Sequence, residues 1–228
     1  MIPLKDLNPT AKTSWATYLL VGANLLVFLL QLQIGLAEGQ AASIAFIERL
    51  GLVPAYLLTP TLWSAMPISA PLTVFTSMFV HGSLLHLLGN LLYLWVFGDN
   101  VEDAMGSIRF LAFYLSCGVG AAITQAAMAT DSIVPMVGAS GAIAGVLGAY
   151  LVLYPRAKVL TLVFLIFFIR LIYLPAIVLL GLWFLIQLVS ATGGNDVGVA
   201  WYAHVGGFVM GLLLIRSFIV RAPSPHSV

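Results

Sequence analysis

Long apolar runs separated by short polar segments dominate the chain. A helix needs roughly 20 apolar residues to cross the hydrocarbon core of a membrane. Six segments predict such helices, at Trp15–Ile34, Leu84–Val101, Ile108–Met128, Gly138–Leu153, Leu174–Ser190 and Trp201–Ile219. We therefore expect an all-α membrane protein, a six-transmembrane-helix bundle in one domain over residues 15–221, with solvated tails at 1–14 and 222–228.

Two apolar segments between these runs are not predicted to be separate spans. The run Val159–Tyr173 is interrupted by Arg170 and followed by Pro175, which predicts a connector at the membrane face or, alternatively, an extension of the fifth span. The stretch Gly35–Ser83 is too hydrophobic for a free linker, yet its prolines rule out one continuous helix. We expect it to be a structured loop in the membrane interface; its prolines are Pro54, Pro60, Pro67 and Pro71.

The composition agrees with a chain whose solvent is largely lipid. Hydrophobic residues make up 61% of the 228 residues and charged residues only 7%, whereas a soluble domain carries about 25% charged residues. The net charge is +1 without any basic run, so nucleic acid is not an expected partner. The single cysteine, Cys117, falls inside the third predicted span and cannot form an internal disulfide bond.

The distribution of Lys and Arg predicts the orientation in the membrane. If the N-terminus lies inside, the inner segments contain Lys5, Lys12, Arg109, Arg156, Lys158, Arg216 and Arg221. The outer loops contain only Arg49, while Arg170 is ambiguous. By the positive-inside rule, both termini are expected to be cytoplasmic. No organelle-targeting feature is evident, so the expected location is the plasma membrane.

The first run, Trp15–Ile34, also resembles a cleavable signal peptide, because Lys5 and Lys12 precede it and small residues follow near Gly35. The core of a signal peptide has about 7–15 apolar residues. This run is longer, and its length favours a retained span over a cleaved leader.

Few polar side chains occur inside the predicted spans, where lipid makes them costly and where they tend to mark function. These residues are His86, Asn90, Gln125, Ser140, Gln187 and His204. His86, Ser140 and His204 each follow the start of an outside-to-inside span by two or three residues, or roughly 3–5 Å. Asn90 is one turn deeper on the face of His86. We therefore expect these four side chains to meet near the outer surface.

Small residues on two of the spans permit a close approach. They recur at a spacing of four at Gly141, Gly145, Gly207 and Gly211. Such residues promote close packing of helices in membranes, so we assign the four glycines to helix packing. His204 shares the face of the glycines in the sixth span, and a hydrogen bond between Ser140 and His204 is therefore expected.

A Ser140–His204 pair suits nucleophilic catalysis. A serine hydroxyl needs a base to remove its proton, and neutral imidazole acts as one near pH 7. The oxyanion that forms needs hydrogen-bond donors, which His86 and Asn90 can supply. The only nearby acid, Asp196, lies in a loop, so a Ser–His dyad is favoured over a triad. Each residue alone is more often a packing residue, but the shared depth favours catalysis.

These residues form part of four motifs that occur together between residues 50 and 215. The motifs are His86-x-x-x-Asn90 with His81 upstream, Glu102-x-x-x-Gly106-x-x-x-Phe110, Gly138-x-Ser140-Gly141, and Ala203-His204-x-x-Gly207-x-x-x-Gly211. A lone G-x-S-G is weak evidence, because similar strings occur in soluble hydrolases. With all four in this order, the chain resembles the rhomboid family of intramembrane serine proteases.

The resemblance implies a six-helix core with a water-accessible cavity open to the outer side. It implies Ser140 as nucleophile and His204 as base, with His86 and Asn90 in the oxyanion site. Its implied partners are the lipid bilayer and single-span membrane proteins, which are cut at small residues near the membrane surface. Nothing in the sequence points to a cofactor or a metal ion.

Two positions depart from the pattern of the family. Leu72-Thr73 stands in the first outer loop where many members carry Trp-Arg. Ala144 stands one turn after the serine, where many members have an aromatic ring that stacks on the catalytic histidine. Neither departure removes a reacting group, and another side chain can support the histidine.

Two other functions stay open at this point. One is a catalytically silent rhomboid-like protein that binds membrane helices, against which the presence of both Ser140 and His204 argues. The other is a small transporter or metal permease that uses His81, His86 and His204 as ligands. That function lacks the intramembrane acids that cation pathways need, and it leaves Ser140 without a role.

Overall fold

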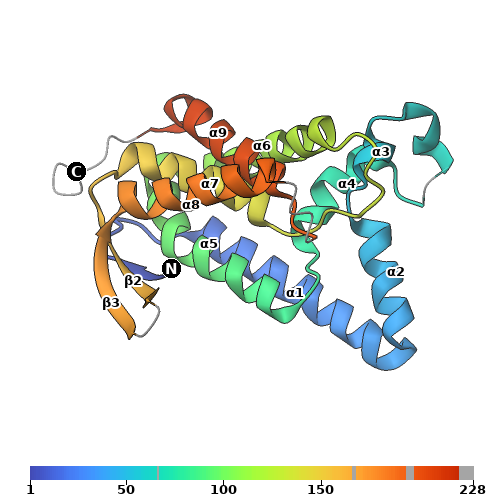
Figure 1. Ribbon diagram of the computed structural model, residues 1–228, viewed down its shortest axis with the longest axis horizontal. Coiled ribbons are helices and arrows are strands. Elements are labelled where there is room, and N and C mark those ends of the chain that lie inside the picture. Colours follow the sequence, from blue (N-terminus) through green and yellow to red (C-terminus); the bar gives the residue numbers. More distant parts are fainter. Residues whose placement is uncertain (66, 166–167, 194–197, 221–228) are drawn as a thin grey trace.

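The computed structural model describes residues 1–65, 67–165, 168–193 and 198–220. All six segments predicted to be spans contain a helix, and these helices lie together in one bundle (Figure 1). They are α1 (Trp15–Glu38), α5 (Leu84–Met105), α6 (Ser107–Met128), α7 (Ser140–Leu153), α8 (Ala176–Thr192) and α9 (Trp201–Phe218). The prediction of a mostly helical membrane protein is confirmed.

The helices differ in their ability to cross a membrane. Within the described residues, α1, α6 and α9 are long and apolar enough to do so. A fourth span results if α5 is joined to Ala70–Phe79, from which it is bent by 82°. The helices α7 and α8 are apolar but have only 14 and 17 residues. Length and composition alone therefore do not establish the count of six spans.

The short helix α7 forms the centre of the bundle. Every residue from Ala142 to Tyr150 is buried. A Cβ atom placed on Gly207 would collide with the backbone carbonyl of Gly141, and one on Gly211 with the carbonyl of Gly145. The backbones of α7 and α9 are therefore in contact at the four positions that the sequence assigned to helix packing.

A buried carboxylate holds the start of α1 against α5. Glu102 accepts hydrogen bonds from the backbone N–H groups of Ala16 and Thr17 at 2.9 and 2.7 Å, and from the Thr17 hydroxyl at 2.8 Å. It also accepts one from the Ser107 hydroxyl at 2.6 Å. The first N–H groups of a helix lack partners within it, so Glu102 replaces the cap that Ser14 does not provide.

An antiparallel sheet lies at one end of the bundle, where an all-α fold was expected. Its strands are β1 (Ile2–Asp6), β2 (Lys158–Leu165) and β3 (Phe168–Pro175), in that spatial order. Val159–Tyr173 connects two helices, and the alternative of an extended fifth span is wrong, because α8 begins only at Ala176. The N-terminal segment, expected to be a solvated tail, pairs through β1 with β2. Branched residues such as Val159, Thr161 and Val163 favour an extended chain, and pairing satisfies its backbone groups.

The long segment before α5 is structured, as expected, and consists of short helices at the opposite end of the molecule from the sheet (Figure 1). Pro54 and Pro71 stand in the first turns of two of them, where the missing N–H group costs nothing. A bridge between Leu52 and Met136 ties the segment to the chain before α7. These elements are α2 (Gln40–Leu50), α3 (Pro54–Leu57), η1 (Pro60–Ala65), α4 (Ala70–Thr76) and η2 (Ser77–Phe79). Its place in the membrane interface stays a prediction.

Candidate active site

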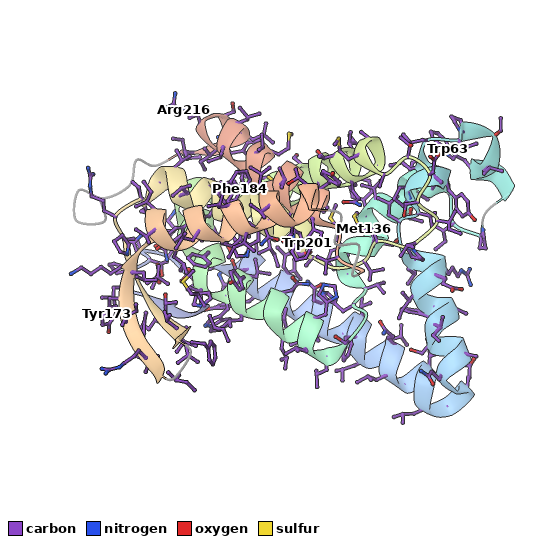
Figure 2. All side chains as sticks on the ribbon, in the orientation of Figure 1. Trp63, Met136, Tyr173, Phe184, Trp201 and Arg216 are labelled. Carbon is purple, nitrogen blue, oxygen red and sulfur yellow. The ribbon has the colours of Figure 1, made fainter. Side chains whose placement is uncertain are left out.

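A cavity of about 480 Å³ opens at the end of the bundle where α5, α7 and α9 begin and α8 ends. Its wall includes the four polar residues that the sequence predicted to converge: His86, Asn90, Ser140 and His204. Met136, labelled in Figure 2, is part of the same wall. The structure therefore brings together side chains from three helices that are far apart in the sequence.

The hydroxyl of Ser140 lies within hydrogen-bonding distance of His204. Ser140 Oγ and His204 Nε2 are 2.8 Å apart. Ser140 is the first residue of α7 and His204 lies in the first turn of α9. The backbones of these two helices touch at Gly141 and Gly207. The close packing at Gly141 and Gly207 thus explains why two short side chains can meet.

The other ring nitrogen of His204 contacts Gln187 of α8. His204 Nδ1 lies 2.8 Å from Gln187 Oε1, and Gln187 Nε2 donates to the carbonyl of Trp183 at 3.2 Å. Because its nitrogen is occupied in this way, Gln187 presents its oxygen to the histidine. The arrangement fits the tautomer in which Nδ1 carries the proton, which leaves Nε2 free to accept the proton of Ser140.

Gln187 was noted in the sequence only as a polar residue of the fifth span, without a role. Its side chain is 5% exposed, and a buried amide of this kind is expected to have a specific partner. The signal in the sequence was the amide side chain itself, because a polar group inside a predicted span is costly without a hydrogen-bond partner. Asp196, the only acid weighed as a third member, lies outside the described residues.

Two tryptophans support the imidazole of His204. The ring of Trp183 lies 6.0 Å away at an interplanar angle of 36°, and the ring of Trp201 lies 6.0 Å away edge-on. Ala144, at the position where an aromatic residue was missing, is fully buried inside α7. The support for the histidine therefore comes from α8 and α9 instead of α7.

Asn90 and His86 lie beside the backbone that leads into Ser140. A Cβ atom on Gly138 would lie 2.7 Å from His86 Nε2 and 3.4 Å from Asn90 Nδ2. Gly138 also has a φ of +117°, which residues with a side chain rarely adopt. Asn90 Nδ2 is buried and has no hydrogen-bond partner among the described residues. It is therefore a free donor beside Gly138, two residues before the serine.

His81 lies behind the cavity and is not part of its wall. Its ring is fully buried and packs edge-on against His86 with the centroids 5.1 Å apart. Its backbone carbonyl accepts a hydrogen bond from Gln31 at 3.0 Å. These contacts are consistent with the sequence analysis, which left His81 out of the dyad.

Metal binding has little support from this geometry. Within the described part of the chain, no three His, Cys, Asp or Glu side chains are placed to hold one ion. His204, one of the three histidines considered for a metal permease, has both ring nitrogens engaged by protein groups.

Comparison with known proteins identifies the fold family. The sequence model of the Rhomboid domain family matches residues 69–221. The chain is 30% identical over 157 residues to "Rhomboid protein 1, mitochondrial" of Saccharomyces cerevisiae, covering 64% of this chain and 41% of the relative. It is 35% identical over 147 residues to "RHOMBOID-like protein 4" of Arabidopsis thaliana, covering 64% and 33%. It is 30% identical over 145 residues to "Presenilin-associated rhomboid-like protein, mitochondrial" of Bos taurus, covering 61% and 36%.

The relatives match this chain over only part of their length, and their names correct the predicted location. The match spans at most 41% of the length of these three relatives. Two of the three are named as mitochondrial proteins. The expected plasma-membrane location, which rested only on the absence of a targeting feature, is therefore wrong, and the Lys and Arg pattern no longer places the termini in the cytoplasm. The domain match covers more than half of the chain and includes every residue of the site, and the chain belongs to the rhomboid family.

Proposed function

We propose that the chain is a serine endopeptidase that hydrolyses peptide bonds in or near the transmembrane segments of membrane-protein substrates. The observation that carries this proposal is the 2.8 Å contact between Ser140 Oγ and His204 Nε2 in the wall of a cavity. A serine and a histidine at this distance are the nucleophile and the base that peptide hydrolysis by a serine-protease mechanism uses.

The proposed reaction has two halves, acylation and deacylation of Ser140, and His204 acts as base and then as acid in each. His204 takes the proton of Ser140 as the serine oxygen attacks the carbonyl carbon of the substrate. It then gives that proton to the leaving amine as the C–N bond breaks, which leaves an ester on Ser140. A water molecule, deprotonated by His204, then attacks the ester carbonyl. As the ester bond to Ser140 breaks, His204 returns this proton to the serine oxygen and the carboxylic acid product is released.

Three groups serve the oxyanion that forms at each attack. The free amide N–H of Asn90 and the His86 ring line the cavity beside Ser140. The backbone N–H of Ser140 stands at the start of α7, where helix donors lack internal partners. We assign all three as oxyanion donors, and Gln187 as the residue that positions His204.

We infer that the substrates are single-span membrane proteins. A helical peptide bond is shielded by its own hydrogen bonds, so the segment must unwind before it enters the cavity. Small residues near the membrane surface make such unwinding easier, because glycine and other weak helix formers stabilise a helix least. The names of the mitochondrial relatives favour a mitochondrial membrane as the location, which cell fractionation would test.

The test is proteolysis by the purified protein in liposomes with a labelled single-span substrate. We expect cleavage by the natural chain and none by Ser140→Ala or His204→Ala. A serine-directed fluorophosphonate should label the natural chain but not Ser140→Ala. No cleavage across a panel of substrates would instead favour a catalytically silent protein that binds membrane helices. Equal cleavage by Ser140→Ala would remove Ser140 as the nucleophile.

A further inference from the structure

The sheet, at the opposite end of the bundle from the cavity, has an exposed apolar face. Paired residues of β2 and β3 lie on the same face, among them Phe164 with Ile169 and Leu162 with Leu171. The side chains of Phe164, Ile169, Leu171 and Tyr173 are 54%, 66%, 58% and 54% exposed. Tyr173, labelled in Figure 2, lies at the end of the molecule farthest from the short helices α2 and α3.

The other face of the sheet is attached to the helices. Val159 and Thr161, which alternate with the exposed residues, are fully buried. Asp6 of β1 is also buried, and it accepts a hydrogen bond from the Tyr150 hydroxyl of α7 at 2.7 Å. The exposed face therefore points away from the bundle and is not covered by any described residue.

The far end of the β2–β3 hairpin has a sequence that is unusual for a hairpin in water. The six residues from Phe164 to Ile169 are all apolar, whereas turns facing water are rich in Gly, Asn, Asp and Pro. The two strands reach past the helices at this end of the molecule (Figure 1). Phe164 and Ile169, the described side chains nearest this end, are 54% and 66% exposed, and lipid would cover apolar surface of this kind.

The junction between β3 and α8 indicates where the sheet lies relative to the membrane. Strand β3 ends at Pro175 and α8 begins at the next residue. The first turn of α8 already exposes Ile177 and Val178, which is the pattern of a helix surrounded by lipid. The sheet therefore starts where the apolar exterior of the bundle ends, at the surface of the membrane.

The charged side chains of the sheet indicate which lipid headgroups would bind to it. Its strands contain four ionisable residues that carry charge near pH 7: Lys5, Asp6, Lys158 and Arg170. The three cations are exposed, while the one acid is buried against α7. The exposed charge of the strands is therefore entirely positive, and anionic headgroups are its complement.

We propose that the β2–β3 hairpin lies in the lipid leaflet at this end of the bundle, with its exposed apolar face in the boundary between headgroups and acyl chains. Lys5, Lys158 and Arg170 bind the headgroups of anionic phospholipids. The outer edge of β3 carries backbone groups without a strand partner, so the hairpin stays at the level of the headgroups and does not enter the hydrocarbon core. This proposal does not depend on proteolysis.

The first experiment measures the depth of the hairpin. A fluorescent probe is attached to Ile169→Cys in a Cys117→Ala background, and the protein is reconstituted in phosphatidylcholine vesicles with phosphatidylglycerol. We expect quenching by lipids that carry a nitroxide near the headgroup, and protection from aqueous iodide. A matched probe on Arg156→Cys, an exposed residue just before β2, should show the reverse. Iodide quenching at both positions would overturn the proposal.

The second experiment measures the role of the charges. Native mass spectrometry compares the binding of phosphatidylglycerol by Lys5→Gln/Lys158→Gln/Arg170→Gln with that of Arg49→Gln/Arg109→Gln/Arg216→Gln, which removes three exposed cations elsewhere. A surface cation contributes about fivefold to binding, so we expect a loss of up to about 100-fold in the sheet variant. Equal losses in both variants would remove the sheet as the binding surface.

A second copy of the chain is the competing occupant of this face. If two β3 edges paired, Ile169→Cys would form cross-links between copies in dilute vesicles, and the probe at this position would be shielded from both quenchers. That result would overturn the lipid proposal, whereas a monomer quenched by lipid supports it.

Discussion

The amide oxygen of Gln187 lies 2.8 Å from Nδ1 of His204, on the opposite side of the imidazole from Ser140. The ring is thus held at both nitrogens, as it is by the carboxylate of a serine-protease triad, but by a neutral group. A neutral acceptor suits a site surrounded by apolar helices, because burying a carboxylate there costs far more than burying an amide.

Replacement of Gln187 should separate positioning from packing. We expect Gln187→Met, which keeps the volume but removes the acceptor, to lower kcat about fivefold with little change in KM, since a neutral hydrogen bond contributes roughly 1 kcal/mol. Gln187→Glu keeps an acceptor and should retain more activity than Gln187→Met. Steady-state kinetics in liposomes and the ¹⁵N shifts of His204, which report its tautomer, are the measurements. Equal effects of both substitutions would indicate a packing role only.

Loss of the free amide donor should affect turnover more than binding. Under the proposed function, we expect Asn90→Ala to lower kcat by about 10²–10³-fold, as removal of an oxyanion donor does in characterised serine proteases. KM should change little, because the oxyanion exists only during the reaction. An unchanged kcat would remove Asn90 from the oxyanion site.

The contact between α7 and α9 should not tolerate a methyl group. In Gly207→Ala the new Cβ would collide with the carbonyl of Gly141, a backbone atom that cannot move without separating the helices. Overpacking costs about 1–3 kcal/mol, which corresponds to a fall in Tm of roughly 2–10 °C. Gly181→Ala in α8, where a Cβ would meet nothing within 4 Å, is the matched control. Thermal unfolding in detergent should show a fall for the first variant only.

The attachment of β1 should weaken as the pH rises. Burial raises the pKa of Asp6 from 3.8 to about 6, against the opposing effect of the hydrogen bond from Tyr150. Folding thus favours the protonated acid, so this contribution is complete below pH 3.8 and is lost as the pH rises through about 6. Asp6→Asn, which stays neutral and can still accept from Tyr150, should remove this part of the pH dependence. Amide exchange of β1 measured across this range would reveal it, and identical profiles for both proteins would contradict it.

The helices and the Ser140–His204 contact could be predicted because both follow from local patterns. Apolar runs locate helices, and glycines spaced by four identify the face on which two helices touch. His204 shares that face, so its partner could be found without knowing the rest of the fold.

The sheet and the support of His204 depend on contacts that no local pattern encodes. Val159–Tyr173 is apolar enough for a helix, and its strands are recognised from the pairing of β2 with β3 and with the distant residues Ile2–Asp6. Trp183 and Gln187 both reach His204 because α8 packs beside α9, a relation that a one-dimensional sequence does not contain.

The shortness of α7 has a consequence for the depth of the site. With 14 residues it is about 21 Å long, whereas the hydrocarbon core measures about 30 Å. A short helix facing lipid would thin the bilayer or tilt its neighbours. The central part of α7 is buried among other helices, so the bilayer does not adapt to its length. The end of α7 at Ser140 therefore opens into the cavity inside the protein. Under the proposed function, a substrate segment would have to leave the lipid to reach it.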